Sequence, residues 1–375
     1  MQTETFDFII IGAGCAGLSL AYRLADTKYK VCVLEKNSNN VVTNKNWSFW
    51  KTYNHPYEKI IKKSWDSFSV SYEKQRAVVD CKNYPYQALK SKDFEEYTKN
   101  KITNSNNINI LYDVKELQLK DVKDGVEVSS SNFKLHCNHV FDSSPVNLNS
   151  SIWQVFKGLY IEHENLDSIF KIPHLMDFTD QKKDEFHFMY FLPFTNTSSL
   201  IESTYFSKKE NLEKLSEDYI KQFIKDEYKI NSYNIISKEA GKIPMSLHNK
   251  FQSGRYITKI GSYSGVTRPS TGYTFLNIQK QIDYLVKNID TKNYNFRYKP
   301  HSKYLIFMDK IYLSIIENDA KKGKIITFRM FEKINRNTVI KFLSDIPTIT
   351  DIFKIIFSLP KLIFIKHLLK VLRNE

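Results

Sequence analysis

The apolar residues near the N-terminus follow a strand–helix–strand pattern. Residues 6–11 form an almost continuous apolar run, which is typical of a buried parallel strand. Apolar residues recur at helical spacing over residues 16–25, and residues 31–34 form a second short apolar strand. The pattern therefore predicts one βαβ unit within residues 6–36.

The rest of the chain alternates between regions of different periodicity. Residues 37–65 are polar and irregular, residues 151–206 are aromatic and favour β structure, and the chain from residue 303 onward is helical, apolar and basic. The other expected elements are a helix at 86–101, a strand at 108–112, an antiparallel meander at 114–141, a charged helix at 208–230, a strand at 254–261, a Pro/Gly-rich loop at 264–272 and a helix to about residue 288.

The composition is that of a globular protein with an acidic partner. The chain has 375 residues, of which 42% are hydrophobic and 26% charged, enough for one large or two intergrown domains. The formal net charge of +14 favours nucleic acid or an anionic membrane surface. No compact Lys/Arg cluster and no zinc-finger spacing occurs, so we expect neither nucleic-acid binding nor a metal site.

Three features favour a cytoplasmic location. Glu4 and Asp7 precede the apolar run from Phe8 to Gly12, where a signal peptide would carry positive charge. No stretch is long and charge-free enough to span a bilayer. The four cysteines lack C-x-x-C spacing and fit reduced, buried thiols. We expect a protein that is soluble or peripheral on the inner face of the cell membrane.

Residues 12–17 match the dinucleotide-binding sequence G-x-G-x-x-G, after a strand and at the start of a helix. Gly12 permits the tight turn, Gly14 lets the backbone approach a pyrophosphate, and Gly17 lets the helix pack on the strand. Glu35 ends the second strand and can accept hydrogen bonds from ribose hydroxyls. The alternative is a Gly-rich βα turn without a ligand.

A second Gly-rich segment, from Gly261 to Gly272, favours FAD over NAD. FAD proteins whose fingerprint lies at the extreme N-terminus are closed by a late strand–loop–helix that returns to the flavin. Thr271 is a candidate N-cap there, and a helix N-terminus beside the flavin would stabilise a reduced, anionic ring. Arg268 either contacts the flavin or its phosphates, or is an exposed loop arginine. The whole segment could also be an ordinary surface loop.

These features predict an α/β protein. We expect a Rossmann-like FAD-binding domain of discontinuous segments, a β-rich substrate domain and a helical C-terminal region. The expected divisions are residues 1–150 for the first part of the FAD-binding domain, 151–253 for the substrate domain, 254–290 for the returning FAD segment and 291–375 for the helical, basic region.

Nine short motifs within residues 6–290 share their order with those of a known family. They are DFIIIGAGCAG (7–17), WSFW (47–50), DSS (142–144), QVFKG (154–158), LMDF (175–178), YFLP (190–193), LIEST (200–204), EAGKIPM (239–245) and RPSTGY (268–273). In these motifs the chain resembles the flavin-dependent lycopene cyclases of the bacterial lycopene β-cyclase type.

The resemblance implies a redox-neutral reaction. In that family the linear ends of lycopene become β-rings, with reduced FAD as cofactor and NADPH as the expected source of electrons. The family's essential carboxylate lies in an acidic-threonine motif, which Glu202 and Thr204 match here. Ser203 stands where many relatives carry a second acidic residue. Gly261 is followed by Ser262 rather than the aspartate usual in flavin hydroxylases, which argues against an ordinary hydroxylase.

Ring closure requires a strong acid buried among apolar groups, because the substrate is a hydrocarbon. A carboxylic acid with a raised pKa meets this requirement. Glu202 lies in an apolar strand whose alternation places it on one face with Leu200 and Thr204. It is either this acid or a structurally paired carboxylate. Glu239 and Asp177 could each orient a neighbouring group, accept the departing proton or cap a turn, and for Asp177 we favour the structural role.

Aromatic faces can stabilise the carbocation that forms during ring closure. For any single candidate, however, we favour ordinary core packing. The candidates are Trp47, Phe49, Trp50, Tyr190, Phe191 and Tyr273.

The tail from Asp351 to Arg373 alternates apolar clusters with lysines, and Pro360 kinks it. This pattern fits a pair of helices that lies on an anionic lipid surface, where lycopene dissolves. The alternative is a core helix packed on the FAD domain.

Two other functions remain open at this point. One is a FAD-dependent oxidoreductase, either a hydroxylase or a prenyl reductase, acting on a lipophilic substrate. It would consume NADPH in step with product. The other is a non-catalytic flavin- or carotenoid-binding protein, which Ser203 beside Glu202 suggests.

Overall fold

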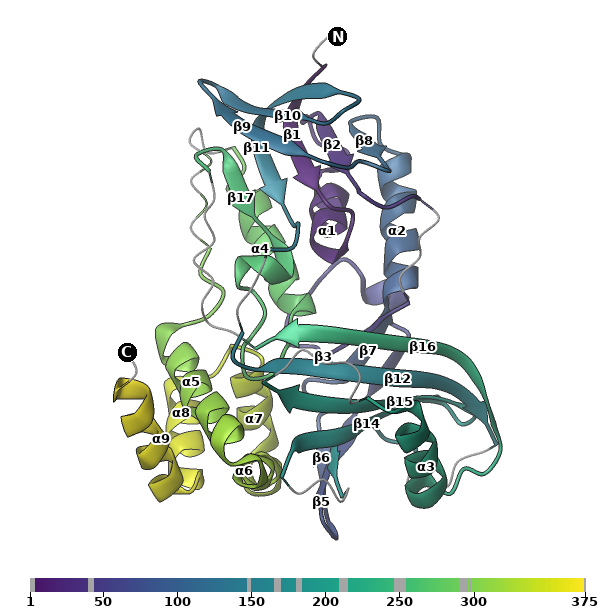
Figure 1. The fold of residues 1–375 in the computed structure, drawn as a ribbon, viewed down its shortest axis with the longest axis vertical. Helices are drawn as coiled ribbons and strands as arrows, with labels where there is room; N and C mark the ends of the chain where they lie inside the picture. Colours follow the sequence, from purple (N-terminus) through teal and green to yellow (C-terminus); the bar gives the residue numbers. More distant parts are fainter. Residues whose placement is uncertain are drawn as a thin grey trace.

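The structure is a computed structural model that describes residues 4–39, 44–146, 150–164, 170–179, 184–208, 215–245, 254–290, 294, 296 and 298–373. Within these residues the strands form two seven-stranded sheets and one three-stranded sheet. Figure 1 shows the first sheet at one end of the molecule, the second sheet at the other end, and the C-terminal helices beside the second sheet.

The first sheet contains the predicted βαβ unit. Its strand order is β8-β2-β1-β11-β10-β9, and β17 pairs with β11. Phe8 and Ile10 pack toward the helices, whereas Ile9 and Ile11 pack on the opposite face. The elements are β1 (Glu4–Ile11), α1 (Cys15–Leu24), β2 (Val31–Leu34), α2 (Ser91–Thr103), β8 (Ile108–Leu111), β9 (Gln118–Val122), β10 (Gly125–Ser129), β11 (Lys134–Asp142), β17 (Ile257–Lys259) and α4 (Phe275–Lys287).

The segments at 37–65 and 86–101 differ from the prediction. Strand β7 (Tyr86–Lys90) pairs with β3 (Asn46–Trp50) and with β4 (Lys63–Trp65), and together they form the three-stranded sheet. The helix therefore begins only at Ser91, where the buried residues first recur at helical spacing. Pairing on both edges of β7 overrides the helical propensity of the segment.

The second sheet occupies the middle of the chain. Its order is β16-β12-β15-β14-β13-β5-β6, and β5 and β6 come from the first 150 residues, so residues 1–150 do not all belong to the nucleotide-binding sheet. One face packs against α3 and the other against the C-terminal helices. The elements are β5 (Ser67–Tyr72), β6 (Gln75–Asp80), β12 (Trp153–His163), β13 (His174–Phe178), β14 (Phe186–Thr195), β15 (Ser198–Ser207), α3 (Glu217–Tyr228) and β16 (Tyr233–Pro244).

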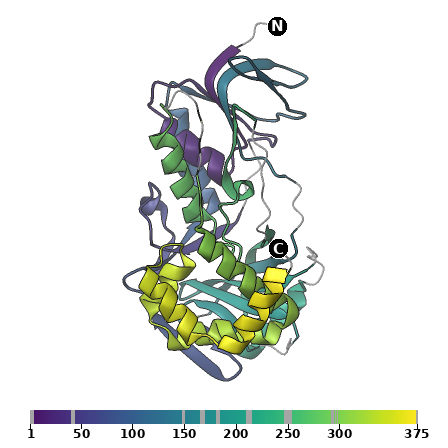
Figure 2. The ribbon, with the colours of Figure 1, turned by 90° about the vertical axis from the view of Figure 1, so that its left-hand side faces the viewer.

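The C-terminal region is helical, as predicted. Helix α6 packs on β5, β6 and β14, while α9 packs on α5 and α8 packs on α7. Figure 2 shows these helices in front of the second sheet. They are α5 (Lys303–Asn318), α6 (Ala320–Lys333), α7 (Arg336–Leu343), α8 (Ile349–Ser358) and α9 (Lys361–Arg373). None of the helices in the described part of the chain is long and apolar enough to cross a membrane.

Candidate active site

The glycine fingerprint forms an open cradle at the N-terminus of α1. Gly12 has a φ of +92°, and a Cβ on Gly17 would lie 1.9 Å from the Gly12 carbonyl oxygen. A Cβ on Gly14, in contrast, would meet no atom within 4 Å. Gly14 is also the N-cap and has no side chain to cap the first N–H groups of the helix. These N–H groups therefore face open space that fits a pyrophosphate.

Glu35 lies directly beside this cradle. Its Oε2 accepts a hydrogen bond from the Ala13 N–H at 2.6 Å, and its Oε1 accepts one from the Asn37 N–H at 2.9 Å. Two backbone donors fix the carboxylate at the end of β2, which is the position required for contact with a ribose.

The returning loop closes on the fingerprint. Gly261 has a φ of +76°, and a Cβ there would lie 2.7 Å from the Ala16 Cβ. Gly272 has a φ of +71°, and a Cβ there would lie 2.5 Å from Oε1 of Gln154 on β12. Both glycines are thus required by close approach, the first to α1 and the second to the second sheet. The donors and the free space of both segments fit FAD.

Two predictions about this loop are wrong. Thr271 is not the N-cap of the following helix, because α4 begins at Phe275 and Thr274 occupies the N-cap position. Arg268 is fully buried rather than exposed, and its Nη2 and Nε contact the Asp309 carboxylate at 3.0 and 3.2 Å. A second carboxylate, that of Asp345, lies 3.6 Å from its Nη1. The guanidinium therefore joins the loop to the C-terminal helices and is not available to a flavin.

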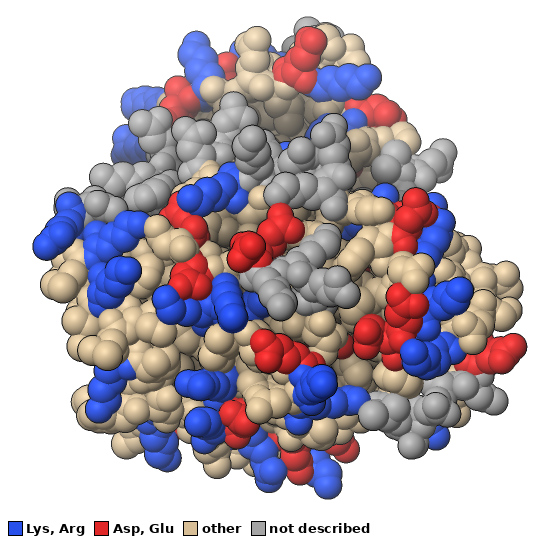
Figure 3. Space-filling view, turned by 60° about the horizontal axis from the view of Figure 1, so that its bottom comes forward, with Lys and Arg blue, Asp and Glu red and all other residues tan. Residues whose placement is uncertain are grey.

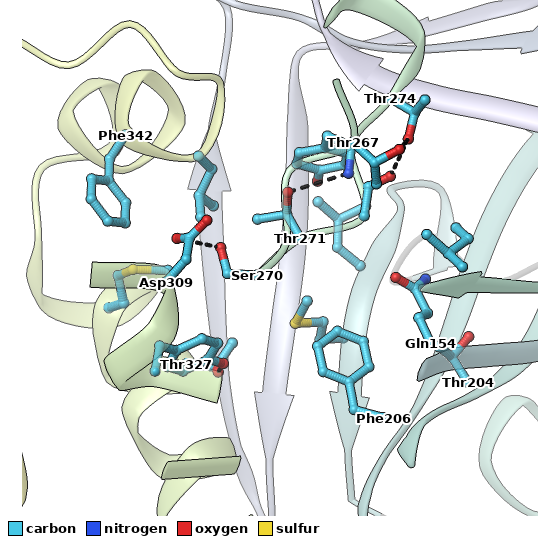
Figure 4. Close-up of a pocket in the computed structure, with 18 of the residues that line it drawn as sticks. Gln154, Thr204, Phe206, Thr267, Ser270, Thr271, Thr274, Asp309, Thr327 and Phe342 are labelled. Carbon is cyan, nitrogen blue, oxygen red and sulfur yellow. Dashed lines mark hydrogen bonds between the residues drawn. The ribbon is translucent and has the colours of Figure 1, made fainter. Parts of the chain in front are cut away.

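A cavity of about 1030 Å³ connects the fingerprint with the C-terminal helices. It extends from Gly14 and Cys15, past Glu202, to Phe364 and Leu368 on α9. Figure 4 shows its two walls: Gln154, Thr204 and Phe206 come from the second sheet, and Asp309, Thr327 and Phe342 from the helices. The loop from Thr267 to Thr274 lies between these walls. Most of the lining is apolar, which suits a hydrocarbon ligand.

Glu202 projects from β15 into this cavity. Leu200 and Phe206 belong to the core on the same face, whereas Ile201 packs against α3 on the other face, as the alternation predicts. Burial raises the pKa of the Glu202 carboxyl well above its usual value, and the charge of Glu239 and a hydrogen bond with it raise that pKa further. Its surroundings therefore favour the protonated form of this carboxyl group.

Glu239 lies beside Glu202 and is held by the backbone. Its Oε2 accepts a hydrogen bond from the Asn46 N–H at 3.0 Å. Burial raises the pKa of Glu239, while hydrogen bonds with Glu202 and Asn46 and the positive charges of Lys45 and Lys90 oppose this rise. The structure thus brings together the two carboxyl groups that the sequence proposed as catalytic.

Four of the six predicted aromatic residues line the cavity: Trp47, Trp50, Tyr190 and Tyr273. Trp50 and Tyr273 form an edge-to-face pair with ring centroids 5.3 Å apart. The hydroxyl group of Tyr190 lies 2.9 Å from that of Tyr86, a lining residue that sequence reasoning did not single out. The helix predicted at residues 86–101 concealed the alternation of side chains along β7, which places Tyr86 on the cavity face.

The remaining two aromatic residues do not line this cavity. Phe191 packs on the α3 face of the sheet, with its ring centroid 4.6 Å from that of Tyr228. Phe49 stacks on Phe275 at 4.8 Å within the core of the nucleotide-binding half. Phe191 follows the lining residue Tyr190, and neighbouring residues of a strand point to opposite faces. Asp177 accepts hydrogen bonds from the N–H and hydroxyl groups of Thr179, so it caps a turn as favoured above.

A comparison with known protein families identifies the family of this chain. The family described as "Lycopene cyclase protein" matches residues 7–368, which is nearly the whole chain. The chain belongs to the lycopene cyclase family. A search among curated proteins finds no match.

Solved flavoprotein structures share the fold of this family member. A geranylgeranyl bacteriochlorophyll reductase-like protein from Thermoplasma acidophilum has 13% identity and a TM-score of 0.64, over 97% of this chain and 99% of that one. A flavoprotein/dehydrogenase from Cytophaga hutchinsonii has 12% identity and the same TM-score of 0.64, over 99% and 100%. A variant of the halogenase PltM, solved in complex with FAD, has 12% identity and a TM-score of 0.58, over 88% and 77%. The chain thus has the α/β fold of FAD-binding flavoproteins, with a helical C-terminal region.

Proposed function

We propose that this member of the lycopene cyclase family is a lycopene β-cyclase that closes the ends of lycopene into β-rings without net oxidation. The observation that carries the proposal is the position of Glu202, a carboxyl group whose pKa is raised by burial, in an apolar cavity that continues to the glycine fingerprint. A hydrocarbon substrate offers no polar group, so a proton donor inside an apolar cavity is the group that its chemistry requires.

The residues of the cavity support each stage of the reaction. Glu202 donates its proton to the terminal double bond, and the carbocation that results attacks the next double bond to close the ring. The aromatic rings of Trp50, Tyr190 and Tyr273 line the space in which this cation forms, and their faces stabilise positive charge. A carboxylate of the same site then removes a proton from the ring. The product has the atoms of the substrate in a new arrangement.

The fingerprint and the returning loop support FAD as the cofactor. Gly12, Gly14 and Gly17 would hold its pyrophosphate, Glu35 its ribose, and the loop from Gly261 to Gly272 would close over it. Reduced FAD, with NADPH as the proposed source of electrons, would supply negative charge that stabilises the cation without hydride transfer.

Helices α8 and α9 support contact with an anionic membrane surface. Several of their large apolar side chains are exposed, and Phe357 and Ile365 also line the cavity, which therefore opens between these helices. The left-hand side of Figure 3, where these helices lie, shows basic side chains beside uncharged surface. The exposed apolar residues are Ile349, Phe353, Ile356, Phe357, Leu362, Ile365, Leu369 and Leu372. A membrane-dissolved carotenoid could enter the cavity directly from the lipid.

The other face of α9 packs on the protein. Ile363, Phe364, Leu368 and Val371 contact the core formed by α5 and α6. The tail is therefore an amphipathic helix that is partly core and partly exposed, and its exposed face is the one we assign to the membrane.

The experiment is a reaction of the purified protein with lycopene in liposomes, under reducing conditions and in heavy water. We expect β-carotene that carries one deuterium for each ring formed, because the acid exchanges its proton with solvent before donating it. NADPH is not consumed in step with product. A product heavier than lycopene by added hydrogen or oxygen, matched by NADPH consumption, would instead establish the oxidoreductase. Bound flavin with no product would leave a binding protein.

A further inference from the structure

One row of residues crosses four strands of the second sheet. Tyr190 on β14 pairs with Glu202 on β15, Glu202 pairs with Gly158 on β12, and Gly158 pairs with Glu239 on β16. Cross-strand partners project from the same face of a sheet. The two carboxyl groups therefore lie on the cavity face, on either side of a residue that has no side chain.

The missing side chain at Gly158 is what lets the two carboxyl groups meet. A Cβ at this position would lie 2.7 Å from the Glu202 Cγ and 3.2 Å from the Glu239 Cγ. The backbone of Gly158 is not in the left-handed region, so its conformation alone does not require glycine. Any larger residue would push the two glutamates apart. The close approach of the carboxyl groups thus explains this glycine.

The hydrogen-bond partners of the pair identify the carboxylate oxygen that lacks a donor. Glu239 Oε2 is occupied by the Asn46 N–H, whereas Glu239 Oε1 is buried and receives no hydrogen bond from an N–H or hydroxyl group of the described residues. A buried carboxylate oxygen without a donor is costly. A proton on Glu202 supplies the missing donor, so a single proton satisfies both side chains.

Charged groups around the pair favour this distribution. Lys45 and Lys90 lie on the side of Glu239, and Asp93 lies further out beside Tyr160. The neighbouring phenols of Tyr160 and Tyr190 stay neutral, because burial raises the pKa of each. The positive charges stabilise an ionised Glu239, and an ionised Glu239 keeps Glu202 protonated.

We propose that Glu202 and Glu239 share one proton across Gly158. Glu239 is the positioning residue that keeps Glu202 protonated for ring closure. This inference rests on the proposed cyclase function. The proton of Glu202 goes to the terminal carbon–carbon double bond, the electrons of the next double bond form the ring bond, and the proton lost from the ring returns to the pair. The pair then holds one proton again, and no electron has left the substrate.

The pair also serves the carbocation between these steps. While the proton is on the substrate, both glutamates are ionised next to one positive charge, which stabilises it. Two adjacent negative charges also make the pair a strong base, so the ring proton is taken back readily. One site thus provides the acid and the base.

The test is infrared titration of the purified full-length protein, in which a protonated carboxyl group absorbs separately from a carboxylate. We expect a protonated carboxyl band at neutral pH that is absent in Glu202→Gln. In Glu239→Gln, removal of the like charge lowers the titration midpoint of that band by about one pH unit or more. Gly158→Ala keeps both glutamates but separates them, and we expect a shift in the same direction. The matched control is Glu162→Gln, an exposed carboxylate on β12, which leaves the midpoint unchanged.

The same variants are then assayed for lycopene conversion across a pH series. If the two glutamates share a proton, Glu202 loses its proton at a lower pH in Glu239→Gln and in Gly158→Ala. The upper limit of the active pH range then falls in both variants, by the shift that the infrared titration measures. A midpoint that is the same in wild type and in Glu239→Gln would overturn the shared proton, even if conversion depends on Glu202 and the cyclase function stands. A midpoint that moves as expected, in a protein that converts no lycopene, would support the pair and reject the function.

Discussion

The nucleotide-binding end and the cavity use their glutamates in opposite ways. At the nucleotide-binding end, Glu35 accepts hydrogen bonds from two backbone N–H groups beside an open helix N-terminus. In the cavity, Glu202 lies in apolar surroundings beside a second carboxyl group. The first arrangement suits the recognition of polar groups, and the second favours a protonated carboxyl group among apolar side chains. Under the proposed function, one fold thus separates the binding of a cofactor from acid chemistry on a hydrocarbon.

The two regions meet at the returning loop, which Arg268 ties to the C-terminal helices. Arg268→Ala leaves the buried carboxylates of Asp309 and Asp345 without their cation, so we expect the free energy of unfolding to fall by about 3–5 kcal/mol. Urea unfolding of the variant and the wild type measures this loss. An equal stability of both proteins would show that the loop does not depend on this ion pair. Val78→Ser, an exposed substitution on β6, is the control.

The nucleotide-binding end can be broken in two distinct ways. Gly17→Ala places a Cβ 1.9 Å from the Gly12 carbonyl oxygen, so we expect a loss of about 3 kcal/mol or more in stability. Gly14→Ala meets open space, so stability of the flavin-free protein stays within about 0.5 kcal/mol while FAD affinity falls by about tenfold or more. Thermal unfolding and flavin fluorescence titration separate these effects. Equal destabilisation by both substitutions would contradict an open cradle at Gly14.

Stability against pH sharpens the contrast on the cavity side. The pKa of Glu202 is raised in the folded protein, so the folded state binds more protons than the unfolded state above the ordinary glutamate pKa. Glu202 therefore reduces the stability of the wild type as the pH rises through this window, by about 1.4 kcal/mol for each pH unit. Glu202→Gln has no carboxyl group at this position and does not show this loss. We therefore expect the variant to be more stable than the wild type at neutral pH, and the difference in stability to vanish as the pH falls to the ordinary glutamate pKa. A constant difference across that pH range would contradict a raised pKa.

The smallest effect concerns the opening of the cavity at α8 and α9. Leu362 is 84% exposed, so Leu362→Ser leaves the fold intact but removes one side chain from the proposed lipid contact. We expect binding to anionic vesicles to weaken by about tenfold. Val78, which is 63% exposed on β6, provides the matched substitution Val78→Ser, which keeps vesicle binding unchanged. Equal binding by all three proteins would remove α9 from the membrane contact.

Local signals in the sequence were sufficient for the βαβ unit of the first sheet. The fingerprint from Gly12 to Gly17 and the acidic Glu35 lie within one βαβ unit, so their spacing along the chain fixes their arrangement in space. The same holds for alternation along β15, which places Glu202 on the cavity face. Each of these features depends on contacts between residues near one another in the chain.

The remainder depended on pairing between distant strands. Glu202 and Glu239 meet only because β12 separates β15 from β16 and carries a glycine at the shared register position. The partners of Arg268 are Asp309 on α5 and Asp345 after α7, and no spacing in the sequence indicates these contacts. The position of Phe191, however, was predictable in part. Neighbouring residues of a strand point to opposite faces, so Tyr190 and Phe191 could not both line the cavity, and Phe191 is the one on the other face.

The most direct test of the central claim is pigment analysis in a bacterial host that accumulates lycopene, with the wild type beside Glu202→Gln. We predict that the wild type converts lycopene to cyclic carotenes and that the variant, with folded and FAD-bound protein, loses about 100-fold to 10,000-fold of this activity. Unchanged lycopene with the folded wild type would contradict the cyclase. Conversion by both proteins would keep the function and remove Glu202 as its acid.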